Sequence, residues 1–490
     1  MSTHVNRGLA WLGFASSIVG VLDIVAMLVI LNTWISTEEF GIATKCIWIF
    51  PILDQATDLG LSSALIQRDD HTSERVSTVF WINLFLSAVL FAILLVFAPL
   101  LARHFYGHAI VGWMLIAYGG KLILQNGYFI SSSMIKRELR FKEFSIIRTL
   151  ANFVEFIAKI GFAWAGFGIW CFVLGPLART LVYLVGMQSY HPYRPRWAFN
   201  LKDARDYVRF GLRTSGSQML FYFYTNVDYP IVGYYFGNVA LGLYRLAYEI
   251  VLEPVRIISN VVVDAAFPAF ARLRHSADAV MKQFISFTRL NLITVMSFAA
   301  VVLVAAPELI HVLFPGYEGA VPAARILCVV AVLRAIGFVA PPLLDGIGRP
   351  DRTLTYMTVA SIAMPAAYIL AAVTLGDTLG FKSVAIAWAV GYPIAFVVLI
   401  FMAANTLGGS TLMYVRGVGG VAGCMVLAGA AAAGVRSLMG DAPAPVVLGA
   451  VAATVIIVAG FLLAYTQGLS PRTVMRSLKE PPADARQAET

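Results

Sequence analysis

The chain has 490 residues, of which 59% are hydrophobic and only 13% are charged, and its formal net charge is +9. A mean hydropathy of +0.78 excludes a soluble globular protein. In a soluble chain this charge would favour a nucleic acid partner. Here the excess of Lys and Arg lies mostly between apolar runs, where it reports membrane orientation and contact with anionic lipid, so we expect no nucleic acid.

Fourteen apolar segments are long enough, at about 20 residues, to cross a membrane as helices. They predict an all-α polytopic membrane protein with segments near residues 8–31, 40–63, 77–101, 109–131, 145–166, 168–188, 212–236, 243–266, 284–306, 322–344, 353–375, 381–404, 413–435 and 443–466. With a cytoplasmic N-terminus, the inner loops, tails and adjoining helix ends hold 23 Lys and Arg residues and the outer loops hold three. This asymmetry predicts that both termini are cytoplasmic.

A weak internal repeat divides the sequence into two halves. Gly41 and Gly242 each stand at the start of a segment, and each is followed by a base and then by a mid-segment proline. The repeat predicts two pseudo-symmetric bundles of six helices each. We expect a first half at 1–190, a cytoplasmic linker with a short surface helix at 191–211, a second half at 212–404, two further helices at 405–470 and a cytoplasmic tail at 471–490.

The segment near 243–266 carries a polar stripe. Its members recur every three or four residues, and they are Arg245, Glu249, Glu253, Arg256, Asn260 and Asp264. This spacing places them on one face of a helix, where each charge in hydrocarbon costs about 2.5–3.5 kcal/mol on insertion scales. One interpretation is a set of ion pairs within the helix. We favour the other, a stripe that lines a water-filled cavity, because it runs nearly the full helix.

Two other segments carry polar residues with open interpretations. Asp23 lies near the middle of the first segment without a base in that segment, so it either pairs with a base elsewhere or serves as a proton or cation site. Asn226 and Asp228 lie among tyrosines that include Tyr224, and Arg213 is nearer the cytoplasm. Tyrosines with polar tips suit sugar contacts, and packing between helices is an equal alternative.

The remaining intramembrane charges of the first half have simpler interpretations. Glu155 and Lys159 stand one helical turn apart and predict a self-contained structural ion pair. Asp54 lies near the inner end of its segment, where it can reach the interface. Lys121 and Arg179 lie near the middle of theirs.

The sequence contains neither a phosphate-binding loop nor a dinucleotide fingerprint nor a His/Glu metal cluster, which predicts no cofactor and no resident metal. The short outer loops leave no room for the catalytic region of a polysaccharide polymerase or ligase. Any driving force is then expected from an ion gradient, with H+ or Na+ as a possible coupling ion, from the membrane potential, or from removal of the cargo by later steps.

Eight short stretches match a known family in order and spacing: Glu39-Phe40-Gly41, Asp58 to Arg68, Thr78 to Asn83, Arg137 to Lys142, Gly166 to Trp170, Asn226-Val227-Asp228, Gly242 to Ala247 and Ala266 to Phe270. On these stretches the chain resembles the Wzx-type lipid-linked oligosaccharide flippases. They form the polysaccharide-transport branch of the multidrug/oligosaccharidyl-lipid/polysaccharide exporter superfamily. The resemblance extends over roughly residues 5–400. Within this branch, the chain is similar to the colanic-acid-exporter subgroup.

The resemblance implies two six-helix bundles facing each other in a V, plus two further helices, in the bacterial inner membrane. It implies a non-enzymatic flippase that exports an undecaprenyl-diphosphate-linked repeat unit to the periplasmic leaflet by alternating access, for exopolysaccharide, capsule or lipopolysaccharide synthesis. Implied partners are this glycan, membrane lipid, a polymerase and other assembly proteins. Alternatives in the superfamily are a cation-coupled drug exporter, disfavoured by the intramembrane bases, and a lipid II flippase.

Helix position and spacing alone select the candidate site residues. We expect the cavity for the diphosphate and glycan to be lined by Arg213, Tyr224, Asn226, Arg245, Arg256 and Asn260. We expect a coupling proton or cation to bind among Asp23, Asp228, Glu249 and Glu253.

Overall fold

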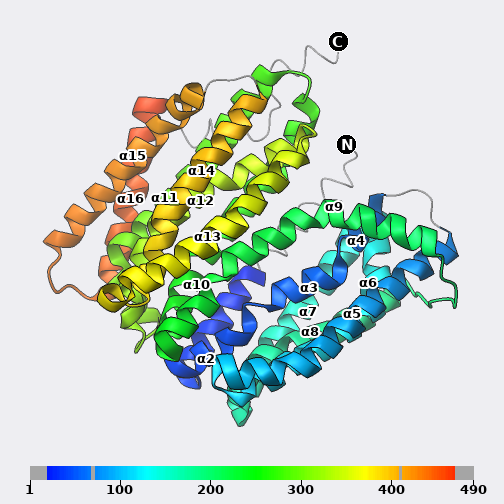
Figure 1. The fold of residues 1–490 in the computed structure, drawn as a ribbon. Coiled ribbons are helices and arrows are strands. Elements are labelled where there is room, and N and C mark those ends of the chain that lie inside the picture. The colour runs from blue at the N-terminus through cyan, green and yellow to red at the C-terminus, as the bar shows by residue number, and fades with distance from the viewer. Residues whose placement is uncertain (1–18, 68–71, 408–410, 469–490) are drawn as a thin grey trace. The chain divides into compact units, whose positions relative to one another are not determined.

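The computed structural model describes residues 19–67, 72–407 and 411–468, and their regular structure is helical (Figure 1). The expected all-α membrane class is thereby confirmed. Within the described residues, eight helical stretches have the length and hydropathy of a membrane span. One of them, Phe141–Tyr190, contains two of the expected segments. The first expected segment is described only from Val19 to Thr33.

The described chain divides into two compact units. Unit 1 comprises Met1–Arg245 and Met357–Val384, and unit 2 comprises Leu246–Tyr356 and Ala385–Thr490. The helix α10 (Asp228–Leu273) therefore begins in unit 1 and ends in unit 2. The division into halves at 190 and 212, drawn from the sequence repeat, stays a prediction.

Unit 1 contains the first half of the chain and one later stretch. Its helices are α2 (Thr37–Ile47), α3 (Phe50–Asp58), α4 (Leu61–Gln67), α5 (Ser73–Leu101), α6 (Ala109–Arg137), α7 (Phe141–Phe162), α8 (Cys171–Tyr190), α9 (Leu201–Asn226), the start of α10 and most of α13 (Pro350–Leu379). A turn separates α7 from α8, where Gly166 and Gly168 adopt positive φ angles of 85° and 53°. Glycine reaches these angles without steric cost, so the expected helix boundary falls at these two residues.

The expected single span near 40–63 is instead three short helices. Pro51 stands in the first turn of α3, where its missing N–H costs no hydrogen bond. Leu59 and Gly60 then take positive φ angles of 41° and 72° and end α3 before α4 begins. Interrupted helices at membrane depth are tolerated where protein or a hydrated cavity surrounds them. This interruption sets the direction of the polar side chains of α3.

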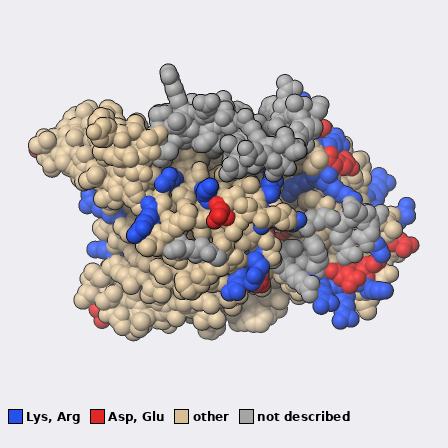
Figure 2. Space-filling model, turned by 90° about the horizontal axis from the view of Figure 1, so that it is seen from above, with Lys and Arg blue, Asp and Glu red and all other residues tan. Residues whose placement is uncertain are grey.

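The helix α9 begins inside the expected linker and continues without a break into the next segment. Its first turns carry Ala204 and Tyr207, which are buried against Leu65 of α4, Val79 of α5 and Ile130 of α6. The predicted surface helix is therefore packed on the protein by its apolar face. Lys and Arg side chains lie at many places on the face of the protein that is seen from above (Figure 2).

Unit 2 contains the rest of α10 with α11 (Ala277–Leu313), α12 (Val321–Gly346), most of α14 (Lys382–Thr406), α15 (Thr411–Leu438) and α16 (Ala444–Gln467). The last helix shows why the two C-terminal helices pack here. Val447, Val451 and Val455 repeat every four residues and are buried in one apolar cluster with Ala305 of α11 and Ala432 of α15. One face of α16 thus packs on the protein, and the helix is apolar all round, as is typical of a membrane span.

Two glycines of the sequence repeat meet where α2 crosses the start of α10. A Cβ atom on Gly41 would overlap the backbone oxygen of Asn238, and a Cβ atom on Gly242 would overlap that of Thr37. The two helices therefore approach at backbone distance, which small residues permit in membrane proteins. The Asn238 side chain also lies 2.8 Å from Nε2 of His108.

Candidate functional site

Unit 1 contains an open, charged cavity of ≈ 610 Å³ among α3, α4, α6, α7 and α8, with Tyr222 of α9 at its wall. Its lining includes three acidic and four basic residues, which are Asp54, Asp58, Glu155, Lys121, Lys136, Lys159 and Arg179. Charged side chains inside apolar segments face a protein interior or water, and they mark functional sites by default. We call this space the charged cavity.

Helical spacing explains why these residues share one space. On α6, Tyr118, Lys121, Gln125, Tyr128 and Ser132 follow each other at steps of three or four residues, and all five line the charged cavity. Such steps place side chains on one face of a helix. Asp54 and Asp58 on α3, Glu155 and Lys159 on α7, and Arg179 and Tyr183 on α8 are likewise one turn apart.

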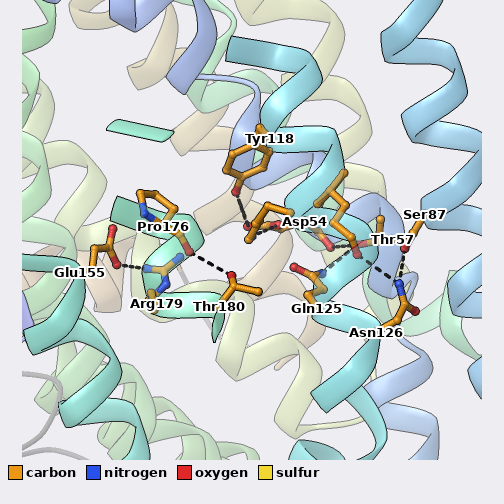
Figure 3. A network of polar contacts seen from close by, with 12 residues as sticks. Asp54, Thr57, Ser87, Tyr118, Gln125, Asn126, Glu155, Pro176, Arg179 and Thr180 are labelled. Carbon is orange, nitrogen blue, oxygen red and sulfur yellow. Dashed lines mark hydrogen bonds and ion pairs between the residues drawn. The ribbon is translucent and has the colours of Figure 1, made fainter. Parts of the chain in front are cut away.

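Glu155 is the centre of the first ion cluster of the charged cavity. One carboxylate oxygen lies 2.8 Å from Nζ of Lys159. The other lies 2.7 Å from Nη1 of Arg179 (Figure 3). Lys159 also lies 3.4 Å from Oδ1 of Asp23. The predicted pair of Glu155 and Lys159 is therefore present, and it is not self-contained. The structure shows Asp23 paired with a base from another helix, one of the two alternatives left open by the sequence.

Asp54 is the centre of the second ion cluster. Its Oδ1 lies 2.6 Å from Nζ of Lys121, and its Oδ2 accepts a 2.8 Å hydrogen bond from the Tyr118 hydroxyl. Phe50 stacks on the Tyr118 ring with centroids 3.5 Å apart, which fixes the ring that holds the carboxylate. The Lys121 side chain is 4% exposed and the Asp54 side chain 35%, so the acid is the member that faces the open space.

Uncharged polar side chains extend this cluster into the bundle. The Gln125 amide donates to Oγ1 of Thr57 at 3.2 Å, and the Asn83 amide donates to the Thr57 carbonyl at 3.0 Å. The Asn126 amide donates to Oγ of Ser87 at 2.9 Å (Figure 3). These bonds tie α3, α5 and α6 together beside the charged cavity and help to position Asp54.

Arg179 is the most exposed base of the two clusters, with 30% of its side chain exposed. A guanidinium carries five N–H donors, and the contact with Glu155 is made through Nη1. Arg179 can thus hold Glu155 and a ligand at the same time. The arrangement offers fixed donors and acceptors in an open space, with chemistry suited to binding.

Apart from Asp23, which contacts Lys159 of the lining, the described residues that the sequence selected for the site do not line the charged cavity. Asp228 is fully buried at the start of α10, where Oδ2 accepts a 2.7 Å hydrogen bond from the Tyr244 hydroxyl. The guanidinium of Arg245 lies 4.9 Å from the centroid of the Tyr229 ring. These contacts join the two stretches of α10 on either side of Gly237, whose φ of 83° breaks the helix.

Further along α10, Glu253 and Arg256 form an ion pair at 2.7 Å. This contact is the intrahelical alternative considered for the polar stripe. Glu249 is half-buried, and Asn260 is exposed. The side chain of Asp264 lies outside the described residues.

The tyrosines expected to form a site on α9 have two different environments: one is packed inside the protein, and another lines the charged cavity. Tyr224 is 2% exposed, and its carbonyl accepts a 3.4 Å hydrogen bond from the Tyr368 hydroxyl. Asn226 donates to the Tyr222 carbonyl at 2.8 Å. The neighbouring ring of Tyr222 is the one that reaches the charged cavity. The side chain of Arg213 lies outside the described part of the chain.

Residues 30–317 match the sequence profile of a family described as "Polysaccharide biosynthesis protein". The chain is 26% identical over 363 residues to the teichuronic acid biosynthesis protein TuaB of Bacillus subtilis, covering 72% of this chain and 73% of that protein. It is 24% identical over 389 residues to the lipopolysaccharide biosynthesis protein WzxC of Escherichia coli, covering 77% and 78%.

Two solved structures share the fold. A lipid II flippase MurJ in an inward closed conformation superposes with a TM-score of 0.72 at 12% identity, covering 94% of this chain and 98% of that one. An inward-facing multidrug resistance MATE transporter of the MOP superfamily superposes with a TM-score of 0.62 at 17% identity, covering 80% and 94%. Both similarities concern the arrangement of helices.

Proposed function

Because the chain belongs to the polysaccharide biosynthesis protein family, we propose that it is a flippase for a lipid-linked oligosaccharide. The glycan, carried on undecaprenyl diphosphate, passes from the cytoplasmic to the periplasmic leaflet of the bacterial inner membrane and serves the assembly of a surface polysaccharide. Both chain termini lie in the cytoplasm. The protein makes and breaks no covalent bond of its cargo.

The charged cavity of unit 1 is the observation that carries this proposal. A glycan headgroup cannot cross hydrocarbon unless its hydroxyls keep hydrogen-bond partners. The charged cavity supplies them inside a membrane protein, and its ≈ 610 Å³ lies within the range of about 300–1,000 Å³ typical of small-molecule sites. It therefore accommodates part of an oligosaccharide at a time.

A drug exporter of the same superfamily is the second candidate. The charged cavity does not favour it, because three acidic and four basic residues line it and it therefore has no excess of acids to attract a cationic drug. A flippase of lipid II remains the nearest alternative in chemistry. Its cargo is also a lipid-linked saccharide, and identification of the lipid intermediate that accumulates in a deletion strain distinguishes the two.

Arg179→Gln is expected to reduce surface polysaccharide at least about tenfold, because one lost charged contact of about 1.4 kcal/mol already costs that factor. The measurement is complementation of a deletion strain, with surface polysaccharide and lipid-linked intermediates both quantified at matched protein levels. Arg325→Gln is the control, since Arg325 is an exposed arginine of α12 in unit 2 whose Nε donates to the Leu303 carbonyl. Equal export by both variants would exclude Arg179 from the path.

The same assay tests the arginines of α10. We keep Arg245 and Arg256 as proposed contacts of the diphosphate. Each alanine variant is expected to lower export and to accumulate lipid-linked intermediate. Unchanged export at normal protein level would remove that arginine from the mechanism.

For coupling, Asp23 has the best geometry of the four proposed carboxylates. Its side chain is 58% exposed and lies 3.4 Å from the Lys159 ammonium, so protonation or a bound cation would release that ion pair. Asp23→Asn is expected to fold normally and to abolish the acceleration of flipping by an imposed H+ or Na+ gradient in proteoliposomes. The rate without a gradient is the internal control, and undiminished acceleration would contradict the role.

A further inference from the structure

We infer that the charged cavity binds the uncharged sugar rings of the cargo and not its diphosphate. This inference rests on the proposed function and names the part of the substrate that this one site recognises. Three properties of the described residues carry it: the balance of charge, the partly exposed members of each ion pair, and the aromatic side chains.

The balance of charge is the first property. Asp54 pairs with Lys121, and Glu155 pairs with both Lys159 and Arg179. Asp23 supplies the second acid at Lys159. These two clusters therefore contain three acids and three bases, and the other charged residues of the lining, Asp58 and Lys136, add one of each. A diphosphate carries more than one negative charge and needs excess cations to offset its desolvation, whereas this set is neutral as a whole.

The exposure of each pair is the second property. In the Asp54 cluster the acid faces the open space, with 35% of its side chain exposed against 4% for Lys121. In the Glu155 cluster the base does, with 30% exposed for Arg179 against 4% for Glu155. The charged cavity thus presents one fixed acceptor and one fixed donor. A sugar hydroxyl both donates and accepts, so adjacent hydroxyls can bind to such a combination.

The aromatic lining is the third property. Tyr128 of α6 and Tyr183 of α8 are half-buried and stacked, with ring centroids 5.3 Å apart, and Tyr222 of α9 is half-buried at the same wall. A tyrosine combines an apolar ring face with a polar tip. The C–H face of a pyranose is apolar and its rim is polar, so these rings match a sugar. These rings add no positive charge for a phosphate, and the bases of the lining already supply hydrogen-bond donors to one.

The test is ligand binding to the purified full-length protein in nanodiscs, measured by calorimetry. One probe is the repeat-unit oligosaccharide released without lipid or phosphate from the producing strain, and the other is inorganic pyrophosphate. The oligosaccharide is expected to bind, and Asp54→Asn and Arg179→Gln are each expected to weaken that binding at least about tenfold. Pyrophosphate binding, where present, is expected to be the same in these variants as in the wild type.

Tyr222→Ala provides a variant that leaves both ion clusters intact, and it is also expected to weaken oligosaccharide binding. Arg325→Gln is the control and is expected to bind as the wild type does. Oligosaccharide binding that is unchanged in Tyr222→Ala and Arg179→Gln would overturn the inference, as would pyrophosphate binding that depends on Arg179. Flipping by the wild type in proteoliposomes is measured separately. If the wild type flips the cargo but pyrophosphate binding depends on Arg179, the inference fails and the proposed function stands. If the wild type does not flip the cargo, the proposed function itself fails.

Discussion

Glu155→Gln is expected to destabilise unit 1 by about 3–5 kcal/mol, because it removes the one buried partner shared by two cations. The Glu155 side chain is only 4% exposed and lies 2.8 Å from Lys159 and 2.7 Å from Arg179. A glutamine keeps the shape and loses the charge, so Arg179 stays inside the bundle without its acidic partner and Lys159 keeps only the 3.4 Å contact with Asp23. The measurement is the free energy of unfolding, or the midpoint of thermal unfolding, of the purified protein in detergent.

Glu143→Gln is the matched control on the same helix. Glu143 pairs with Arg140 at 3.4 Å near the start of α7, with both side chains about one third exposed. Exposed ion pairs contribute about 0–1 kcal/mol, so this variant is expected to unfold almost as the wild type does. Equal destabilisation by the two substitutions would mean that the Glu155 cluster is solvated like a surface pair, and the account of the charged cavity would fail with it.

Gly41→Ala and Gly242→Ala are each expected to destabilise the protein by about 3 kcal/mol or more, the upper part of the range for overpacking. The added Cβ would overlap the backbone of the facing helix, at Asn238 in one case and Thr37 in the other. Backbone cannot swing aside as a flexible side chain does, so α2 and α10 must separate. We expect reduced yield and a lowered unfolding midpoint, measured by size-exclusion chromatography and thermal unfolding.

Gly161→Ala in α7 and Gly120→Ala in α6 are the controls for this prediction. Nothing lies within 4 Å of a Cβ built at either position. In an open helical position alanine is favoured over glycine by about 1 kcal/mol, so both controls are expected to be neutral or slightly stabilising. If Gly41→Ala behaves as Gly161→Ala does, the close crossing of α2 and α10 is not a feature of the folded protein.

The sequence predicted those features that depend on neighbours along the chain. Hydropathy predicted the helical membrane class, the glycines at 166 and 168 predicted the turn between α7 and α8, and a four-residue spacing predicted the Glu155–Lys159 contact. Each of these follows from local geometry. The break of the span near 40–63 was missed at Leu59, because positive φ in a non-glycine residue has no reliable sequence signal.

The charged cavity itself was missed because three of the four ion pairs in its two clusters join different helices. Asp54 and Lys121 are 67 positions apart, and only the packed bundle brings them within 2.6 Å. Sequence reasoning weighted the dense stripe of α10 instead, where charges follow each other on one helix. A usable signal was present, since three helices of the first half each carry polar residues one turn apart. It becomes informative only when those residues are considered together.

Reconstituted flipping tests the central claim most directly, namely that the charged cavity of unit 1 is the transport site. Purified protein is placed in proteoliposomes with the lipid-linked oligosaccharide, and a membrane-impermeant glycan-binding reagent reports how fast the glycan of one leaflet reaches the other. We predict rapid exchange for the wild type and for Arg325→Gln, and a loss of at least about tenfold for Arg179→Gln. Exchange by Arg179→Gln at the wild-type rate, with the variant folded, would contradict the account.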